Sequence, residues 1–250
     1  MAGPVIDILM YHSITEGAHP TQIAPSVFAD QIEAIAASGV PVIGLDAVAD
    51  GLSGKTDLAP RSVVITFDDA FQDFADAAWP ILKRHEFAPV VYVPTGHVGG
   101  HAGWPGASEP HLPIMGWDTI RALTADGVDF QSHSVTHPDL TQLDATDLES
   151  ELRASKDRLE HELGHKIAHF APPYGASNDM VLREINTHYT TSCGTRLDSA
   201  GNGSSRLDLP RLEMYYFRNP SRVSQQMAGC GDMYVRLRKG LRRIRRIVAP

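Results

Sequence analysis

Short apolar runs alternate along this chain with longer segments in which apolar residues recur every three or four positions. This alternation favours parallel strands joined by crossover helices, because buried parallel strands are apolar on both faces whereas covering helices are amphipathic. We predict helices over 26–38, 71–85 and 146–163, and strands over 6–11, 40–43, 63–67, 89–94, 128–132, 167–171 and 189–193. The sequence therefore predicts an α/β fold, a distorted (β/α) barrel of about seven parallel strands with its chemistry at the C-terminal strand ends.

The length of the chain favours one catalytic domain. It has 250 residues, of which 42% are hydrophobic, enough to bury one substantial core. We expect this domain to cover residues 1–232 and to be followed by a basic amphipathic helix over 233–250. The first ten residues lack a basic leader and reach Asp7 too early for a secretory signal, so we expect a cytoplasmic protein.

Charge is distributed unevenly along the chain. The formal net charge is −8, yet residues 236–246 hold seven basic side chains and no acidic ones. The remainder of the chain is thus strongly acidic. An acidic body binds nucleic acid poorly, so we expect no nucleic-acid partner.

Two adjacent carboxylates, Asp68 and Asp69, follow the apolar run Val63-Val64-Ile65. Carboxylates at the end of a buried strand are costly to desolvate unless a cation or hydrogen bonds compensate them. Because side chains alternate along a strand, we expect the two to face different directions and to do different jobs, one holding a metal and the other acting as a base. The alternative is a turn acid and a helix cap before the 71–85 helix.

Two histidines, His133 and His137, directly follow the predicted strand 128–132. If the chain turns into a helix there, residues four apart project on one side and can coordinate one ion through neutral imidazole nitrogens. Together with an aspartate from another strand end they make three protein ligands. That set leaves coordination sites for water, as expected of a catalytic zinc.

A third motif, Pro172-Pro173-Tyr174-Gly175, ends the predicted strand 167–171. The two prolines lack an N–H and restrict the backbone, so the next free backbone donor is the N–H of Tyr174. This donor is suited to binding an oxyanion. The alternative is that the motif is only a tight loop.

The motifs Thr-Phe-Asp-Asp, His-Ser-x-x-His and Pro-Pro-Tyr-Gly, in this order and spacing, resemble those of the polysaccharide deacetylase family, the carbohydrate esterases with a NodB-type domain. The likeness extends from about residue 5 to 215 and takes in Leu209-Pro-Arg-Leu. It implies hydrolysis of the N-acetyl group of an amino sugar. It also implies metal ligation by Asp69, His133 and His137, water activation by Asp68, and an oxyanion and substrate site at Pro173 and Tyr174.

The chain departs from that family at two positions. Many members carry Arg where Ala171 stands, and that Arg orients the catalytic Asp; many also place a catalytic His late in the chain, where none occurs after His188. The same departures resemble the subgroup that deacetylates poly-N-acetylglucosamine, in which an early Leu-x-Tyr-His supplies the acid. Leu9-Met10-Tyr11-His12 fits that pattern, so we assign the acid role to His12; the alternative is a structural His at a strand end.

The expected cofactor is one divalent ion, Zn²⁺ in the first place, although two His, one Asp and water also suit Ni²⁺, Co²⁺ or Fe²⁺. Features of the sequence also suggest three other functions. The missing Arg suggests a sugar-binding module that has lost catalysis, and a deformylase of a lipid-linked amino sugar uses the same chemistry. The run His161-Glu162-Leu163-Gly164-His165 matches the zinc protease pattern, but on the 146–163 helix His161 faces away from the apolar stripe.

The segment 233–250 has the pattern of a membrane-surface helix. Its apolar residues recur at spacings of three and four, with the basic residues mostly around the other face; they are Tyr234, Leu237, Leu241, Ile244 and Val248. We expect it to bind an anionic membrane surface, which would put the protein on the inner membrane face beside lipid-linked saccharides. The alternative is that the helix packs its apolar face on the acidic body.

Overall fold

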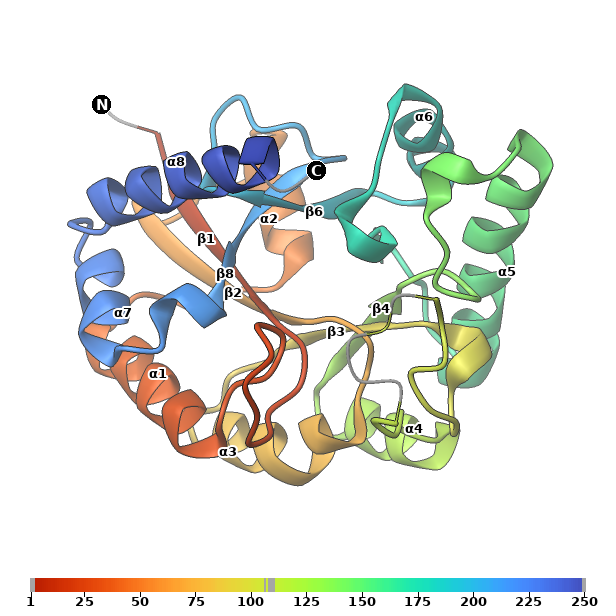
Figure 1. Cartoon of the computed structure of the whole chain (residues 1–250), viewed down its shortest axis with the longest axis horizontal. Helices are drawn as coiled ribbons and strands as arrows, with labels where there is room; N and C mark the ends of the chain where they lie inside the picture. The colour runs from red at the N-terminus through yellow and green to blue at the C-terminus, as the bar shows by residue number, and fades with distance from the viewer. Residues whose placement is uncertain (1–2, 106, 108–110, 249–250) are drawn as a thin grey trace.

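Seven parallel strands close into a barrel, which confirms the predicted fold class (Figure 1). The computed structural model describes residues 3–105, 107 and 111–248, with side chains described as far as residue 242. Hydrogen bonding runs in the order β2-β3-β4-β5-β6-β8-β1, and β1 pairs again with β2 to close the ring. The strands are β1 (Val5–Tyr11), β2 (Arg61–Phe67), β3 (Val90–Val93), β4 (Asp129–Ser132), β5 (His169–Phe170), β6 (Thr191–Leu197) and β8 (Leu209–Glu213). A short strand, β7 (Ala200–Gly201), pairs antiparallel with the start of β1.

One predicted strand is wrong and another was missed. Residues 40–43 make only an isolated bridge, between Val42 and Val63. The seventh position of the barrel belongs instead to β8, which pairs in parallel with both β6 and β1. Pro210 lacks a backbone donor and Arg211 is charged, so this segment does not read as an apolar strand.

Helices surround the barrel, and one of them, α2, contributes to its inner core. They are α1 (Pro25–Ser38), α2 (Leu45–Leu52), α3 (Trp79–Arg84), α4 (Trp117–Ala125), α5 (Ala145–Leu163), α6 (Asp179–His188), α7 (Pro220–Met227) and α8 (Asp232–Val248). The Asp144 side chain caps α5 by accepting the N–H groups of Thr146 and Asp147. The predicted 71–85 helix begins at Gln72 and contains the π-helix η1 (Phe74–Ala78), which runs into α3. Among the described residues no helix is long and apolar enough to cross a membrane.

The core has an inner and an outer layer. Alternate strand residues such as Ile6, Ile8, Val64 and Tyr92 fill the barrel, and Leu45 of α2 joins them. The intervening strand residues, together with the helices, form the larger outer cluster. Helix α2 therefore packs against the inside of the barrel near the start of β1, and the carboxyl ends of the strands are left for the functional side chains.

Candidate metal centre and catalytic site

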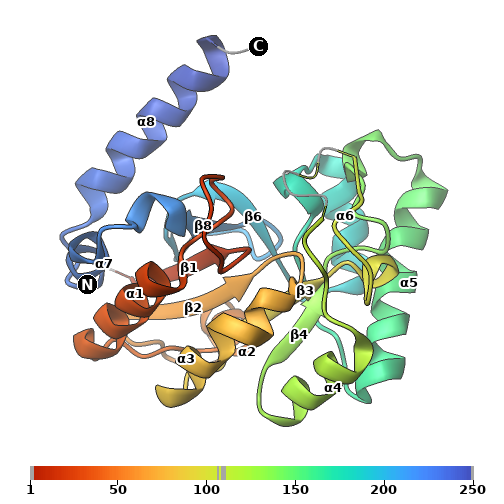
Figure 2. The same ribbon diagram turned by 60° about the horizontal axis from the view of Figure 1, so that its bottom comes forward.

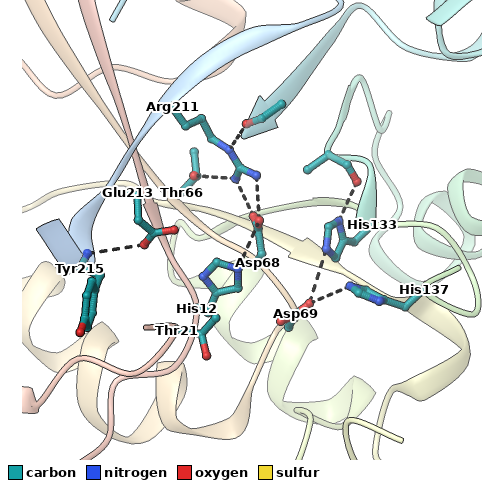
Figure 3. Close-up of polar contacts among 12 residues, drawn as sticks. His12, Thr21, Thr66, Asp68, Asp69, His133, His137, Arg211, Glu213 and Tyr215 are labelled. Atoms are coloured by element: carbon teal, nitrogen blue, oxygen red, sulfur yellow. Dashed lines mark hydrogen bonds and ion pairs between the residues drawn. The ribbon is translucent and has the colours of Figure 1, made fainter. Parts of the chain in front are cut away.

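The predicted site residues meet in one cavity at the carboxyl ends of the strands. His12 follows β1, the two aspartates follow β2, and both histidines follow β4. The cavity has a volume of about 360 Å³. It is lined by His12, Asp68, Asp69, His133, His137 and Tyr174, among others. These segments are far apart in the sequence, and the closed barrel brings them together (Figure 3).

Asp69, His133 and His137 form a buried triad whose ligand atoms all lie within 4.8 Å of one another. The Asp69 Oδ1 atom lies 3.4 Å from His133 Nε2 and 3.3 Å from His137 Nε2. Ligands held at about 2.0–2.1 Å around a tetrahedral ion are separated by about 3.4 Å, so this spacing fits a divalent cation. Asp69 Oδ1 is also buried and accepts no hydrogen bond from any described residue, which leaves it for a cation.

The charge balance of the triad also calls for a cation. Burial by itself raises the pKa of Asp69, but the two imidazoles beside it lower that pKa well below its usual value. Burial lowers the pKa of His137, whereas at His133 it is outweighed by Asp69 and Asp68, which raise the pKa. Asp69 therefore needs a positive charge next to it, and either a proton on His133 or a divalent ion satisfies that need.

The tautomer of one ligand is fixed by the backbone. The Nδ1 of His133 donates to the Ala171 carbonyl at 2.6 Å, so its Nε2 lone pair points at Asp69 and is available to a metal. Ala171, where many family members have Arg, thus contributes its backbone carbonyl to the site.

The segment that carries the two histidines is not a helix, contrary to the expectation above. Ser134 and His137 have positive φ values of 68° and 58°, and the stretch forms a tight turn. The N–H of His137 donates to the Ser134 hydroxyl at 3.1 Å, and the N–H groups of Val135 and Thr136 donate to Glu151 of α5. The turn, held by these bonds, brings both imidazoles to one point.

The two aspartates line one cavity but have different partners, Arg211 for Asp68 and the two histidines for Asp69. Strand β2 ends at Phe67, so side-chain alternation no longer applies, and Asp69 adopts a left-handed φ of 73°. Both carboxylates consequently line the same cavity. Backbone strain of this kind in a residue other than glycine is typical of functional sites.

Asp68 is held by a residue to which the sequence reading gave no role, Arg211 of β8. The Arg211 side chain is fully buried and donates from Nη1 to Asp68 Oδ1 at 2.6 Å and from Nη2 to Asp68 Oδ2 at 2.8 Å. It also donates to the carbonyl of Gly194 and the hydroxyl of Thr66. Burial alone raises the pKa of Asp68, but Arg211 outweighs it and holds the pKa below its usual value.

Arg211 therefore gives Asp68 the arginine partner that Ala171 cannot provide. The feature of the sequence that could have revealed this buried arginine is a charged residue inside the short run Leu209-Pro-Arg-Leu. Because a buried arginine is rare without an acidic partner, such a residue within a strand predicts one.

His12 lies on the other side of Asp68, with its Nε2 atom 3.8 Å from Asp68 Oδ2. Its Nδ1 atom is buried and has no hydrogen-bond partner among the described residues. Glu213, at the end of β8, lies beside His12, and burial raises the pKa of Glu213 while His12 lowers it (Figure 3). Glu213 is a further residue that the sequence reading missed.

The Pro-Pro-Tyr-Gly motif forms the 3-10 turn η4 (Pro173–Gly175) at the edge of the cavity. Tyr174 has a positive φ of 59°, its ring packs edge-on against His137, and its hydroxyl donates to the Pro105 carbonyl at 2.7 Å. A Cβ on Gly175 would lie 2.3 Å from the Thr195 hydroxyl, so only glycine fits there. Pro173 is buried and is not among the residues that line the cavity.

An aromatic residue of the 95–113 segment completes the cavity wall. The Trp104 ring stacks on His137, with centroids 4.2 Å apart and planes 25° apart. Trp104 is 6% exposed and lines the cavity with Ala102 and Ala107. The Trp104 ring thus shields the metal-ligand side of the cavity from solvent.

The zinc protease pattern at 161–165 does not form a site. His161 and His165 are exposed at the end of α5, and Glu162 pairs with Arg121 and Arg158 on the surface. These residues are absent from the lining of the catalytic cavity. The segment is therefore a polar helix end.

Helix α8 packs against the body through the buried Val235, through Tyr234 and through basic side chains. Arg238 lies over the rings of Tyr216 and Tyr234, Lys239 pairs with Asp198 at 2.6 Å, and Arg242 donates to the Thr195 carbonyl at 3.3 Å. Its outward side carries Met233, Leu237 and Leu241, which are 81%, 60% and 48% exposed. The predicted apolar stripe is thus divided, because Leu237 and Leu241 face outward whereas Tyr234 is half-buried and packs against the core. The side chains of Ile244 and Val248 lie outside the described residues.

The sequence of this chain is similar to those of known proteins. The sequence pattern of the polysaccharide deacetylase family matches residues 55–192. The chitooligosaccharide deacetylase of Rhizobium leguminosarum bv. trifolii is 26% identical over 128 residues, which are 50% of this chain and 53% of that protein.

Two solved structures are similar over most of the chain. The deacetylase PplD of Streptococcus pyogenes, in complex with acetate, is 27% identical, with a TM-score of 0.74 over 84% of this chain and 92% of that one. IcaB from Ammonifex degensii is 21% identical, with a TM-score of 0.76 over 92% of this chain and 98% of that one, and shows the shared fold. With the family pattern matching more than half of its length, the chain belongs to the polysaccharide deacetylase family.

Proposed function

We propose that this protein is a divalent-metal-dependent hydrolase that removes the N-acetyl group from an amino sugar of a polysaccharide or lipid-linked saccharide. The observation that carries the proposal is that one cavity holds a cation-binding triad, a carboxylate fixed by arginine, and an imidazole on the far side of that carboxylate. These are the parts that hydrolysis of an amide requires: a Lewis acid, a general base and a general acid.

Asp69, His133 and His137 fit a divalent cation by spacing, by burial and by the orphaned oxygen of Asp69. Two imidazoles and a carboxylate suit Zn²⁺ and also Ni²⁺, Co²⁺ or Fe²⁺. When bound, such an ion supplies the positive charge that makes a water more acidic and stabilises negative charge on the acyl oxygen.

Asp68 is proposed to accept a proton from the attacking water. The two hydrogen bonds from Arg211 keep its carboxylate ionised and fix its orientation. A general base of this kind typically contributes about 10²–10⁴ in rate.

His12 is proposed to donate a proton to the leaving nitrogen. An amine leaves poorly until it is protonated. The Nε2 atom of His12 lies 3.8 Å from Asp68 Oδ2, and both side chains line the same cavity. Glu213, at the end of β8, lies beside His12 on the wall of the same cavity.

The backbone N–H of Tyr174 is proposed to stabilise the oxyanion. Pro172 and Pro173 offer no N–H, so Tyr174, which lines the cavity, supplies the first free backbone donor of this turn. A single such donor typically contributes about 3–4 kcal/mol to transition-state stabilisation. Pro173 contributes rigidity to the turn.

An assay for free amine tests this proposal. Incubation with an N-acetylated glucosamine oligomer should release free amine, a chelator should stop the release, and added Zn²⁺ or Co²⁺ should restore it. Binding of the oligomer without release of amine under any metal would show instead a carbohydrate-binding module. An N-formyl substrate in a parallel arm distinguishes deacetylation from deformylation.

The binding-module alternative was motivated by the alanine at position 171. The structure argues against this alternative, because Arg211 gives Asp68 the arginine partner that Ala171 does not. We therefore favour the enzyme.

Helix α8 is proposed to bind an anionic membrane surface. The apolar stripe of Met233, Leu237 and Leu241 faces outward, and Arg236 on the same helix is exposed as well. The helix extends away from the body toward its C-terminal end, with basic residues continuing to Arg246 (Figure 2). An outward apolar stripe with basic residues is the pattern of an interfacial helix, and two such helices from separate copies would repel one another. This favours a peripheral place on the inner membrane face, near lipid-linked substrates.

Liposome co-sedimentation tests the membrane proposal. The wild-type protein should pellet with phosphatidylserine-containing vesicles and be released by high salt. The Leu237→Ser/Leu241→Ser variant should remain in the supernatant, whereas a Leu163→Ser control on α5 should behave as wild type. Equal pelleting of the double variant and wild type would refute the proposal, as would pelleting that is independent of anionic lipid.

A further inference from the structure

A second cavity, of about 590 Å³, lies next to the catalytic cavity. Its walls come from the turn after β5, from β6 and from α8. The residues that matter below are Gly175, Thr195, Arg196, Asp208, Lys239 and Arg242. Gly175, Thr195 and Arg242 line both cavities, so the two are contiguous. A substrate with its N-acyl group at the metal centre can therefore extend into the second cavity.

The wall of this second cavity is rich in cations. It presents Arg196, Lys239 and Arg242, and the carboxylates near them are Asp198 and Asp208. Lys239 is paired closely with Asp198, at 2.6 Å. Arg196 lies 3.7 Å from Asp198 and 3.8 Å from Asp208, beyond hydrogen-bonding distance.

Arg242 has no carboxylate within 4.0 Å among the described residues. Its Nη1 donates to the Thr195 carbonyl at 3.3 Å, and the ring of Tyr216 lies 6.0 Å from the guanidinium carbon. On the catalytic side, burial raises the pKa of Glu213, and the charge of Arg242 is one of the influences that oppose this rise. A guanidinium has five N–H donors, and these contacts leave most of them for a ligand.

This local positive charge contrasts with a chain whose net charge is −8. A body of that charge repels anions, so a cationic wall beside the catalytic cavity selects locally for them. A neutral sugar gains only a hydrogen bond from an arginine, whereas phosphate and carboxylate match the planar fork of donors.

We propose that the second cavity binds a negatively charged group, a phosphate ester or a carboxylate, that the saccharide carries near its N-acyl sugar. This rests on the proposed function and narrows its substrate class to acidic saccharides. Arg242 makes the principal contact and Arg196 assists, while Lys239 stays on Asp198 and helps to hold α8 in place.

Binding to the Asp68→Asn variant tests the subsite without turnover. The probes are N,N′-diacetylchitobiose, the same disaccharide carrying a 1-phosphate, and a disaccharide that joins N-acetylglucosamine to glucuronic acid. Calorimetry should show that the charged probes bind about tenfold or more tightly than the neutral one, because a charge-assisted contact is worth roughly one decade in affinity. The probe that gains more distinguishes phosphate from carboxylate.

Arg242→Gln in the same Asp68→Asn background should remove the preference for the charged probes and leave binding of the neutral probe within about twofold. The matched control is Arg236→Gln, which removes the same charge from an exposed position on the same helix that lines neither cavity. This control should keep the preference. If Arg236→Gln abolishes it equally, only the general field of α8 is responsible and the subsite is refuted.

The proposal and the proposed function fail in different ways. Equal affinity for neutral and charged probes refutes the subsite, even if the wild-type enzyme deacetylates both. Release of no amine from any probe by the metal-loaded wild type refutes the proposed function, even if the charged probes bind tightly through Arg242. Turnover data for the wild type supply a second check, because kcat/KM should favour the charged probes and this preference should shrink as salt rises.

Discussion

The two sides of the catalytic cavity neutralise a buried carboxylate by different means. On one side Arg211 donates two hydrogen bonds to Asp68, and its permanent positive charge compensates the negative charge of that carboxylate. On the other side no described arginine or lysine reaches Asp69, whose neighbours are the imidazoles of His133 and His137. A permanent cation suits a base that must stay ionised and in place. An open position suits a metal ion that can be bound and removed.

The largest effect should come from breaking the metal side. The Asp69→Ala/His133→Ala variant should contain almost no metal by elemental analysis and should release no more amine than the uncatalysed background, since two of three ligands are lost. The matched control is His161→Ala/His165→Ala, which removes two exposed histidines of the protease-like pattern. Stoichiometric metal in the first variant, or metal loss in the control, would contradict the assignment.

The next largest effect should come from removing the base while keeping the metal. Asp68→Asn should retain its metal and lose about 10²–10⁴ in kcat, because the amide cannot accept the proton of the water. Elemental analysis and kcat are measured on the same preparation. A kcat within about threefold of wild type would show that another residue is the base.

Removal of the acid should discriminate between substrates. His12→Ala should leave the metal content unchanged and lower turnover of an N-acetyl amide by about 10² or more. An activated acetyl ester should suffer much less, because its leaving group needs no proton. Equal losses on the two substrates would mean that His12 is structural.

The smallest effect on turnover should accompany the largest effect on stability. Arg211→Met leaves Asp68 buried without its partner and should lower the free energy of unfolding by about 3–5 kcal/mol, measured by urea denaturation. Turnover should fall about 10- to 100-fold, as is typical when a supporting partner in a site is lost. The exposed pair of Arg153 and Glu149 offers a control, since Arg153→Met should cost no more than about 1 kcal/mol.

The stability difference for Arg211→Met should depend on pH. Because the pKa of Asp68 is held below its usual value, the contribution of the pair is present above the ordinary carboxyl pKa and is lost as pH falls through the pKa of Asp68. In the variant, protonation of Asp68 in acid relieves the unpaired charge. The difference from wild type should therefore shrink as the pH is lowered, and a constant difference would point to packing alone.

Local sequence patterns determined much of the fold and of the metal centre. Apolar runs such as Val63-Val64-Ile65 placed the strands, because a buried strand needs an unbroken apolar surface. Charged or imidazole side chains directly after such runs placed Asp68, Asp69 and the two histidines at the strand ends. The backbone details escaped this reading, since the positive φ of Asp69 and His137 reflects tertiary hydrogen bonds that no periodicity encodes.

The sequence by itself determined which residues can ligate a metal, because each ligand adjoins a strand that the apolar pattern reveals. Only the tertiary structure decided what neutralises Asp68 and which face of α8 packs on the body. Arg211 lies 143 residues from Asp68 and reaches it only because the barrel closes β8 against β1. Helix α8 turns Val235 into the core and its basic side chains toward Asp198 and the Thr195 carbonyl, and these partners lie on parts of the chain that the helix's own amphipathic pattern does not reveal.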